Sequence, residues 1–192
     1  MSKKSDRNDD FEAGQTLARL ERLARLVRSA SHTEGLNAAQ WEALRYLGRA
    51  NRFSNSPGAL ARYLGATKGT TSQTVLSLIK KGTIEKSLRN NDGRSVVLVL
   101  TEAGQKILGD DPLLGLEKAI AKLRDKTSKR FSQGLNALLQ IEIGRQGEPS
   151  FGSCAGCSHA AKDKGEVWCK VLNLNVSADD TQRLCVYHKG KN

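Results

Sequence analysis

Residues 56–101 decide the fold, and they read SPGALARYLGATKGTTSQTVLSLIKKGTIEKSLRNNDGRSVVLVLT. Ser56 and Thr67 belong to the residue types that cap helix N-termini, and a helical pattern follows each of them. Gly65 and Gly82 end these patterns, because glycine is the usual residue where a helix stops. The less polar positions of each predicted helix share one face; they are Leu60, Ala61 and Leu64 in the first helix, and Thr71, Val75 and Leu78 in the second.

A hairpin pattern follows the two helices. Residues 84–88 and 96–100 are β-prone runs, and the Asp-Gly in the turn at residues 90–93 is a strong hairpin signal. Two helices joined by a tight glycine turn and followed by a hairpin form a winged helix-turn-helix. The predicted fold class is therefore mainly α with a small β wing.

The outer face of the second helix is polar and slender, which suits entry into the major groove of DNA. Gln73 on this face is the residue type that reads adenine with two hydrogen bonds, and Ser77 lies on the same face. Arginines flank the hairpin turn, where they would meet phosphates or the minor groove. The candidate DNA-binding residues are Thr67, Lys68, Thr70, Ser72, Gln73, Arg89, Asn91 and Arg94. The alternative interpretation is a solvated amphipathic helix beside an ordinary hairpin.

These motifs resemble those of the MarR family of bacterial transcription regulators. The resemblance rests on residues 60–64, 67–73, 81–86, 92–95 and 100–104, above all on the Asp-x-Arg-Ser wing and the Leu-Thr-x-x-Gly that follows it. It extends over about residues 11 to 145. It implies a homodimeric regulator, most often a repressor, whose two winged domains read a pseudo-palindromic operator in double-stranded DNA. It also implies that the first helix joins the C-terminal helices to build the dimer.

The composition agrees with a nucleic-acid partner. The chain has 192 residues, a formal net charge of +11 and a pI of about 9.7, which favour nucleic acid or another anionic surface. The alternative is a merely soluble cationic protein. No stretch approaches the length of a membrane span, and the N-terminus lacks the apolar run of a secretory signal. We therefore expect a cytoplasmic protein without a membrane partner.

The remaining patterns predict five parts along the chain. Trp41 is expected in a helical core, with a ligand cleft for a small-molecule effector as the alternative, and residues 51–55 are expected to form a polar linker. A Gly- and Pro-containing break is expected at residues 109–112. The five parts are a disordered N-terminus (1–10), a dimerisation helix (11–35), the winged helix-turn-helix (36–104), further dimerisation helices (105–145) and a tail (146–192).

Every cysteine of the chain lies in the tail. They are Cys154, Cys157, Cys169 and Cys185. A tail this small usually needs a bound metal or disulfides to stabilise its fold. Four cysteines in a reducing compartment favour a zinc ion or an iron–sulfur cluster over disulfides. A thiol switch is the third alternative. His188 is a substitute ligand, because a helix predicted to begin after Ser177 would place Cys185 and His188 on one face.

The sequence therefore predicts a DNA-binding regulator whose DNA affinity is modulated through a four-cysteine metal or iron–sulfur site, in response to a redox or small-molecule effector. A CxxC thiol-redox enzyme is the first alternative. It is disfavoured because the CxxC is not in a βαβ pattern, and no other catalytic grouping occurs. A non-specific architectural nucleic-acid-binding protein is the second. We expect no enzyme activity.

Overall fold

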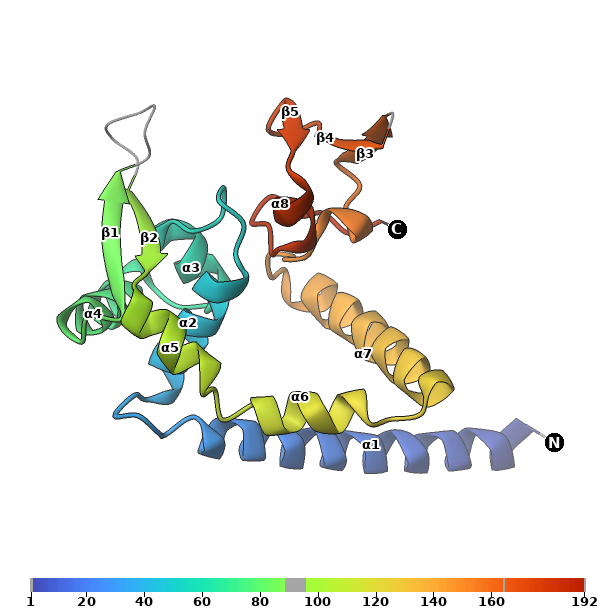
Figure 1. Cartoon of the computed structure of the whole chain (residues 1–192). Helices are drawn as coiled ribbons and strands as arrows, with labels where there is room; N and C mark the ends of the chain where they lie inside the picture. The colour runs from blue at the N-terminus through green and yellow to red at the C-terminus, as the bar shows by residue number, and fades with distance from the viewer. Residues whose placement is uncertain (1, 89–95, 164, 192) are drawn as a thin grey trace.

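The computed structural model describes residues 2–88, 96–163 and 165–191 (Figure 1). The helices and strands up to residue 109 are α1 (Ser2–Ala30), α2 (Ala38–Arg49), α3 (Pro57–Tyr63), α4 (Lys68–Lys80), β1 (Ile84–Leu88), β2 (Val96–Leu100) and α5 (Glu102–Gly109). They are followed by α6 (Leu114–Ala121), α7 (Asp125–Gln146), the 3-10 turn η1 (Cys154–Gly156), β3 (Ala160–Asp163), β4 (Glu166–Cys169), β5 (Leu174–Val176) and α8 (Ala178–Gln182).

Helices α2 to α5 and the hairpin β1–β2 form one lobe around a shared core, called the winged lobe below. Its largest fully buried side chains include Trp41, Tyr46, Leu44, Leu60 and Leu78. Trp41 is therefore a core residue, and its Nε1 donates to the carbonyl of Thr33 at 3.2 Å. The two strands of the hairpin are antiparallel, with Ile84 opposite Leu100 and Leu88 opposite Val96. This is the winged helix-turn-helix that the sequence predicts.

Side-chain caps start α3 and α4 at the predicted residues, Ser56 and Thr67, and Thr101 caps α5 in the same way. Ser56, Thr67 and Thr101 each accept a hydrogen bond from the backbone N–H three residues later. Such caps satisfy N–H groups that have no partner inside the helix. Gly65 stands in the turn between α3 and α4 with φ +58, a conformation that favours glycine.

Helix α5 lies so close to the corner between α4 and β1 that only glycine fits at residue 104. A Cβ added there would lie 2.0 Å from the carbonyl oxygen of Thr83. The hydroxyl of Thr101 donates to the carbonyl of Gly82 at 2.6 Å and holds the same corner.

A buried ion pair joins the winged lobe to the segment between α5 and α6. Arg45 on α2 donates from Nε and Nη2 to the two carboxylate oxygens of Asp111, at 2.7 and 2.8 Å. The side chains are 11% and 10% exposed. Arg45 also donates to the hydroxyl of Ser31 at 3.1 Å and lies over the ring of Trp41. Asp111 lies within the predicted break between α5 and α6, so this contact fixes the direction in which α6 leaves the lobe.

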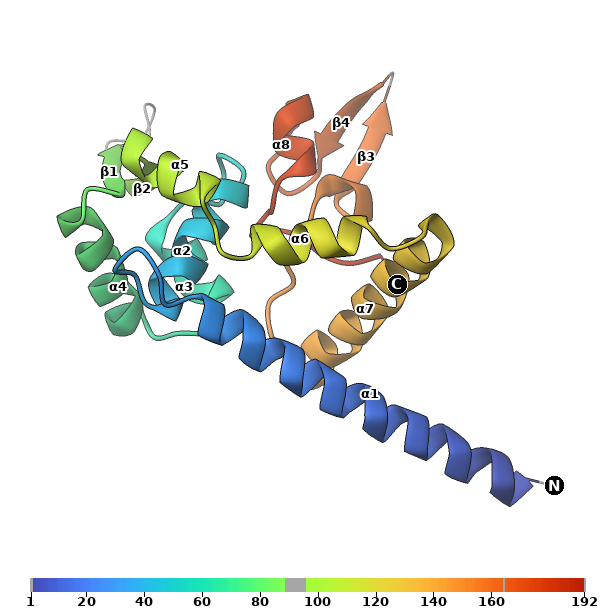
Figure 2. The same cartoon turned by 60° about the horizontal axis from the view of Figure 1, so that its bottom comes forward.

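Helices α1, α6 and α7 extend away from the winged lobe (Figures 1 and 2). No side chain of α6 or α7 is buried, and none is buried among residues 11–30 of α1. Residues 2–10 are helical, in contrast to the predicted disorder; the segment contains neither Gly nor Pro, so nothing in it stops the helix. Within the described residues, no helix is both long and apolar enough to cross a membrane.

The tail folds as a small three-stranded antiparallel sheet followed by a short helix, in the order β3–β4–β5 and then α8. Ser177 caps α8 as predicted, and its hydroxyl accepts from the N–H of Asp180. The helix ends at Gln182, however, so Cys185 and His188 do not lie on one helical face. The reason is that residues 184 and 185 form bridges to Ala50 and Gly152 in place of helical hydrogen bonds.

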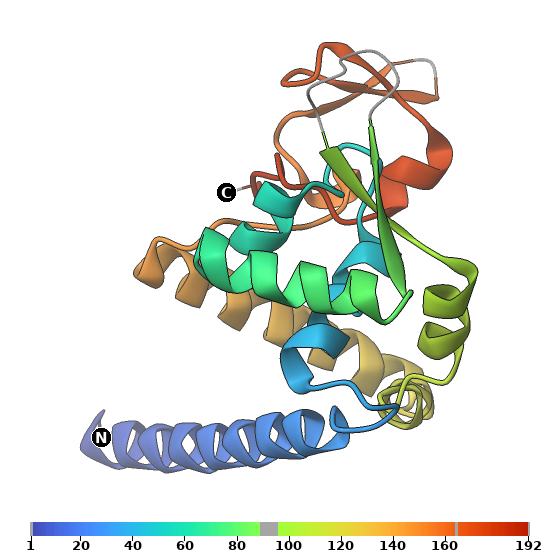
Figure 3. The same ribbon diagram turned by 90° about the vertical axis from the view of Figure 1, so that its left-hand side faces the viewer.

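The tail packs against the winged lobe, on the side away from α1 (Figures 1 and 3). Residues 51–55, which the sequence predicts as a polar linker, form the receiving surface. Asn51 is 1% exposed and Ser54 is fully buried, because their polar groups bond to each other and to the tail. The tail is therefore not an independent appendage.

Candidate nucleic-acid interface

The polar face of α4 is free on the surface of the winged lobe. Thr71, Val75 and Leu78 point into the core, which leaves the opposite face outward. Its exposed polar residues include Lys68, Thr70, Ser72 and Gln73. Apart from a hydrogen bond between the side chains of Thr67 and Thr70, the side chains of this set form no hydrogen bond or ion pair with the rest of the described chain. The face thus offers short side chains to a groove.

Two of the polar positions have structural roles as well. The hydroxyl of Thr67 is the N-cap of α4 and lies 2.9 Å from that of Thr70. Ser77 is only half exposed, because its hydroxyl accepts from the side-chain amide of Gln40 at 2.8 Å. Ser77 therefore holds α4 on α2 and is not on the free face. The predicted wing residues Arg89, Asn91 and Arg94 lie outside the described residues.

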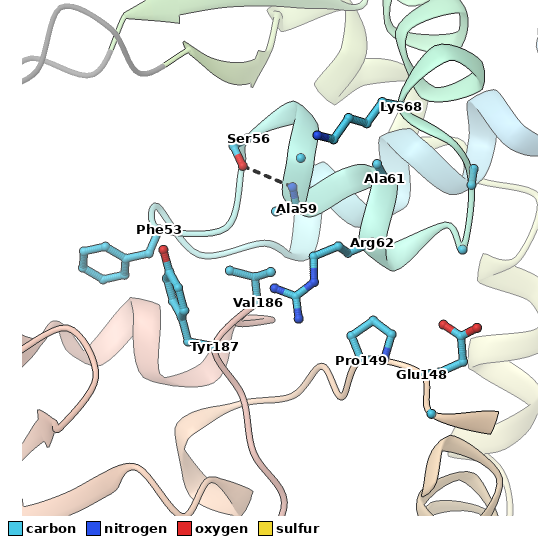
Figure 4. A pocket seen from close by; sticks show the side chains of 14 residues that line it. Phe53, Ser56, Ala59, Ala61, Arg62, Lys68, Glu148, Pro149, Val186 and Tyr187 are labelled. Carbon is cyan, nitrogen blue, oxygen red and sulfur yellow. Dashed lines mark hydrogen bonds between the residues drawn. The ribbon is translucent and has the colours of Figure 1, made fainter. Parts of the chain in front are cut away.

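A cavity of about 890 Å³ opens beside the start of α4 (Figure 4). One wall is the helix-turn-helix, with Ala61 and Arg62 from α3 and Lys68 from α4; the other wall contains Pro149 and Tyr187 from the tail. Arg62 points from α3 toward the tail side of this space. Neither Arg62 nor Lys68 has an ion-pair partner among the described residues. Both cations are therefore available to an anion.

Arg62 is a candidate residue that sequence reasoning missed. It follows the apolar positions of α3 in a stretch read for its capping and turn signals, and nothing local distinguishes it from a solvated arginine. Only the turn at Gly65 brings Arg62 and Lys68 to the same cavity.

The four cysteines gather at one end of the tail, as free thiols. Cys157 donates its N–H to the carbonyl of Cys154 at 3.2 Å, and Cys185 donates to that of Gly152 at 3.0 Å. Cys169 ends β4, opposite Ala160 in β3. Cys157, Cys169 and Cys185 are buried, and Cys154 is partly exposed. We call these four residues the thiol cluster.

Within the thiol cluster, the charge on one sulfur affects the pKa of another. Burial, followed by the negative charge of the neighbouring Cys185, Cys157 and Cys169, raises the pKa of Cys154 to about 11. Negative charge on one sulfur thus disfavours thiolate at the others, unless a cation accompanies it. Four cysteine thiols are a donor set suited to zinc or an iron–sulfur cluster. In residues 2–88, 96–163 and 165–191, however, no three His, Cys, Asp or Glu side chains stand in a geometry that would hold a metal ion.

His188 has partners of its own in the tail. Its Nδ1 lies 2.6 Å from the hydroxyl of Ser150, and its ring lies against Gly152, where a Cβ would come within 2.8 Å of Nε2. Burial lowers the pKa of His188, which favours the neutral ring at neutral pH. These contacts give the histidine a packing role and leave its predicted role as a substitute ligand without support.

Residues 34–95, the winged part of the chain, match the model of the MarR family. None of the curated proteins matches the chain in sequence.

Three solved structures illustrate the shared fold. A MarR transcriptional regulator from Methanosarcina mazei Go1 is 21% identical over 69% of this chain and 96% of its own, with a TM-score of 0.53. A second MarR family transcription regulator is 18% identical over 76% of this chain and 97% of its own, with a TM-score of 0.58. The S. aureus MepR–DNA complex is 16% identical over 65% of this chain and 96% of its own, with a TM-score of 0.50. The match over residues 34–95 and the common fold show that this part of the chain is similar to MarR transcription regulators.

Proposed function

We propose that the chain is a homodimeric, sequence-specific DNA-binding regulator, a repressor, whose affinity for its operator depends on the thiol cluster. The observation that carries the DNA-binding proposal is the free polar face of α4, flanked at its start by Arg62 and Lys68, which have no ion-pair partner in the described part of the chain. Short polar side chains on such a helix reach base edges, and unpaired cations beside it bind phosphates. The S. aureus MepR–DNA complex, which has a similar fold, is consistent with this role.

Within this proposal, the residues divide into two groups. Thr70, Ser72 and Gln73 approach the bases, and Gln73 selects adenine. Lys68 and Arg62 bind the phosphate backbone, together with Arg89 and Arg94 of the wing, which lie outside the described residues. The net charge of +11 supports a strong, salt-dependent contribution from phosphates.

The dimer is proposed from the apolar surface of the extended helices. Helix α7 exposes five large apolar side chains, which are 39–65% exposed: Phe131, Leu135, Leu138, Leu139 and Ile141. Helix α1 adds Phe11, Leu17 and Leu26. An unpartnered apolar surface of this extent favours burial against another chain. A second copy is the occupant that also gives two winged lobes, as a pseudo-palindromic operator requires.

The thiol cluster is proposed to hold zinc or an iron–sulfur cluster, with Cys154, Cys157, Cys169 and Cys185 as ligands. Four cysteines from three segments, three of them buried, support this proposal. Either group would favour the thiolate form of the cysteines and so stabilise the fold of the tail. Metal analysis of protein purified without oxygen distinguishes the two: a brown protein with iron and sulfide contains the cluster, and a colourless protein with about one zinc per chain contains zinc. A colourless protein without metal refutes the metal site and leaves the thiol switch.

The test of DNA binding starts with selection of operator sequences from a random pool by the full-length dimer. Gln73→Ala is then expected to bind matched and mismatched sites with similar affinity, because it has lost its contact with a base. Gln105→Ala is the control, since Gln105 is also exposed but lies on α5. If no sequence is enriched, the protein is an architectural DNA-binding protein. If Gln73→Ala discriminates as well as the native chain does, the role of α4 in reading bases is refuted.

Phosphate contacts are tested by the salt dependence of the affinity. Lys68→Ala is expected to weaken binding to all sites and to reduce the slope of log K against log salt by about 1. Lys80→Ala, at the other end of α4, is the control and should leave the slope unchanged. An unchanged slope for Lys68→Ala would remove Lys68 from the set of phosphate contacts.

A further inference from the structure

We infer that residues 184–186, the docking segment, couple the thiol cluster to the winged lobe, so that the DNA-binding form of the protein requires an intact thiol cluster. The inference rests on the proposed function, and it names the part of the molecule through which the tail acts. Cys185 occupies the middle of the segment, and its two neighbours are bonded into the winged lobe.

The first neighbour, Leu184, is joined to the lobe by its backbone. Its N–H donates to the carbonyl of Arg49 at 2.8 Å, and its carbonyl accepts from the N–H of Asn51 at 2.9 Å. These bonds form a parallel bridge to Ala50, directly after the end of α2. The tail therefore satisfies backbone groups that α2 leaves without partners inside the helix.

The second neighbour, Val186, enters the interior of the lobe. Its N–H donates to the hydroxyl of Ser54 at 2.8 Å, and the same hydroxyl donates to the side-chain oxygen of Asn51 at 2.7 Å. The Tyr46 hydroxyl donates to the carbonyl of Ser54 at 2.6 Å. Ser54 and Asn51 are buried, so departure of Val186 would leave a hydroxyl group of the lobe with one partner fewer.

Apolar contacts support the same docking. The side chain of Val186 is 8% exposed and belongs to the hydrophobic core that includes Leu60 of α3. Phe151, at the start of the tail, lies edge-on to Tyr46 and Tyr63, with ring centroids 6.1 and 5.1 Å away. Undocking would expose these groups to water, which opposes it.

A charged contact adds to the docking from α8. The carboxylate of Asp180 accepts from the backbone N–H of Arg52 at 3.0 Å and pairs with its guanidinium at 3.1 Å. Asp180 is 5% exposed and is held in place by the hydroxyl of Ser177 at 2.7 Å. The tail thus contacts the lobe through backbone and ionic groups at residues 49–54, and through apolar groups at Tyr46, Leu60 and Tyr63.

Cys185 cannot move independently of these contacts. Successive Cα atoms are about 3.8 Å apart, so a displacement of Cys185 displaces Leu184 and Val186 as well. The backbone of Cys185 also bonds to Gly152, on the side of the tail that contains Cys154 and Cys157. Loss of the thiol cluster is therefore expected to loosen the docking segment on the tail side, where the backbone bond between Cys185 and Gly152 would still hold it.

The docking segment also reaches the proposed DNA-binding surface. Val186 and the adjacent Tyr187 line the cavity whose other wall contains Arg62 and Lys68 (Figure 4). Ser54 lies two residues before Ser56, the N-cap of α3. Disorder of residues 51–54 would thus reach the start of the helix-turn-helix, and we expect the undocked form to bind DNA more weakly.

Amide hydrogen exchange on the full-length protein, purified without oxygen, tests the coupling. Cys154→Ser removes one thiol at a partly exposed position, and among the described residues Cys154 has no hydrogen bond to the winged lobe; Ala155→Ser is its control. In Cys154→Ser we expect exchange to accelerate by about tenfold or more both at Asn173, whose N–H bonds within the tail, and at Asn51, whose N–H bonds to Leu184. Operator affinity should fall in parallel, and Ala155→Ser should change none of these quantities.

The outcomes separate the coupling from the proposed function. Faster exchange at Asn173 with unchanged exchange at Asn51 overturns the coupling while the thiol cluster keeps its role in the tail. Unchanged exchange at both amides shows that the thiols do not hold the tail and overturns the inference. DNA binding by the native chain is measured separately, so a failure of DNA recognition is not confused with either result.

A second variant perturbs the docking segment without touching a thiol. Val186→Thr keeps the shape of the side chain and places a hydroxyl in the core, and Val171→Thr in an exposed turn of the tail is its control. Val186→Thr is expected to accelerate exchange at Asn51 and to weaken operator binding, with exchange at Asn173 unchanged. Native exchange at Asn51 in this variant would refute the docking segment as the link, even if Cys154→Ser fails to fold.

Discussion

Replacement of Asp111 by Asn is the sharpest test of how the winged lobe is joined to the segment that leads into α6. The substitution keeps the size of the side chain but removes the charge that Arg45 meets through two hydrogen bonds of 2.7 and 2.8 Å. Because the two side chains are only 11% and 10% exposed, the variant leaves a nearly buried guanidinium without its counter-ion.

The expected loss of stability follows from that burial. Breaking one partner of a buried ion pair costs about 3 to 5 kcal/mol. Arg45 keeps its bond to Ser31 and its contact with the ring of Trp41, so we expect the lower end, about 3 kcal/mol. With a urea dependence of about 2 to 3 kcal/mol per molar, the unfolding midpoint should fall by about 1 M.

The assay is equilibrium unfolding in urea at neutral pH, with the protein concentration held fixed because the proposed dimer would unfold in a concentration-dependent way. Asp110→Asn is the matched control, since Asp110 is exposed and its carboxylate has no ion-pair partner within the described part of the chain. The double variant Arg45→Met with Asp111→Leu should recover most of the lost stability, because it leaves no unpaired charge. Equal midpoints for Asp111→Asn and Asp110→Asn would refute the reasoning.

Three further predictions concern the winged lobe. Burial alone would raise the pKa of Asp111, but the hydrogen bonds from Arg45 hold this pKa below its usual 3.8. The contribution of Asp111 to stability is therefore present above pH 3.8 and is lost as the pH falls through the lower pKa of the folded state. In acid titrations, the difference in the free energy of unfolding between the native chain and Asp111→Asn should shrink over that range. Tyr46→Phe should cost about 1 to 2 kcal/mol in urea unfolding by removing the buried bond to the loop before α3, and Tyr187→Phe, at an exposed tyrosine, should cost nothing measurable. Gly104→Ala should lower the melting temperature, because its Cβ would overlap a backbone oxygen, whereas Gly109→Ala, with open space around it, should leave the melting temperature unchanged or raise it. Equal stability of the two tyrosine variants would contradict the buried bond of Tyr46, and equal melting temperatures of the two glycine variants would contradict the close packing at Gly104.

The parts of the fold that local chemistry determines were predictable from the sequence. Ser56, Thr67 and Thr101 cap helices where their side chains and spacing indicate, and the apolar face of α4 is the one that the pattern predicts. These features depend on neighbours within a few residues. The exposed face of α4 was predictable for the same reason, since the buried face fixes the opposite one.

The contacts of the tail were not predictable, because each one joins residues far apart in the sequence. Asn51 and Ser54 belong to residue types typical of exposed loops, and only the N–H of Val186 and the backbone of Leu184 account for their burial. The end of α8 at Gln182 has the same origin, since the residues after it bond to other segments. Local patterns contain no information about such partners.

The separation of these partners along the chain has a consequence for how the protein acquires its fold. Ser54 and Val186 are 132 residues apart, and Arg52 and Asp180 are 128 apart. The core of the winged lobe therefore lacks part of its interior until Val186 has left the ribosome. Closing a loop of that length is a slow step, and α7 is made in the interval. In newly made winged lobes, Tyr46 and Leu60 should thus remain more exposed to water until the docking segment packs against them.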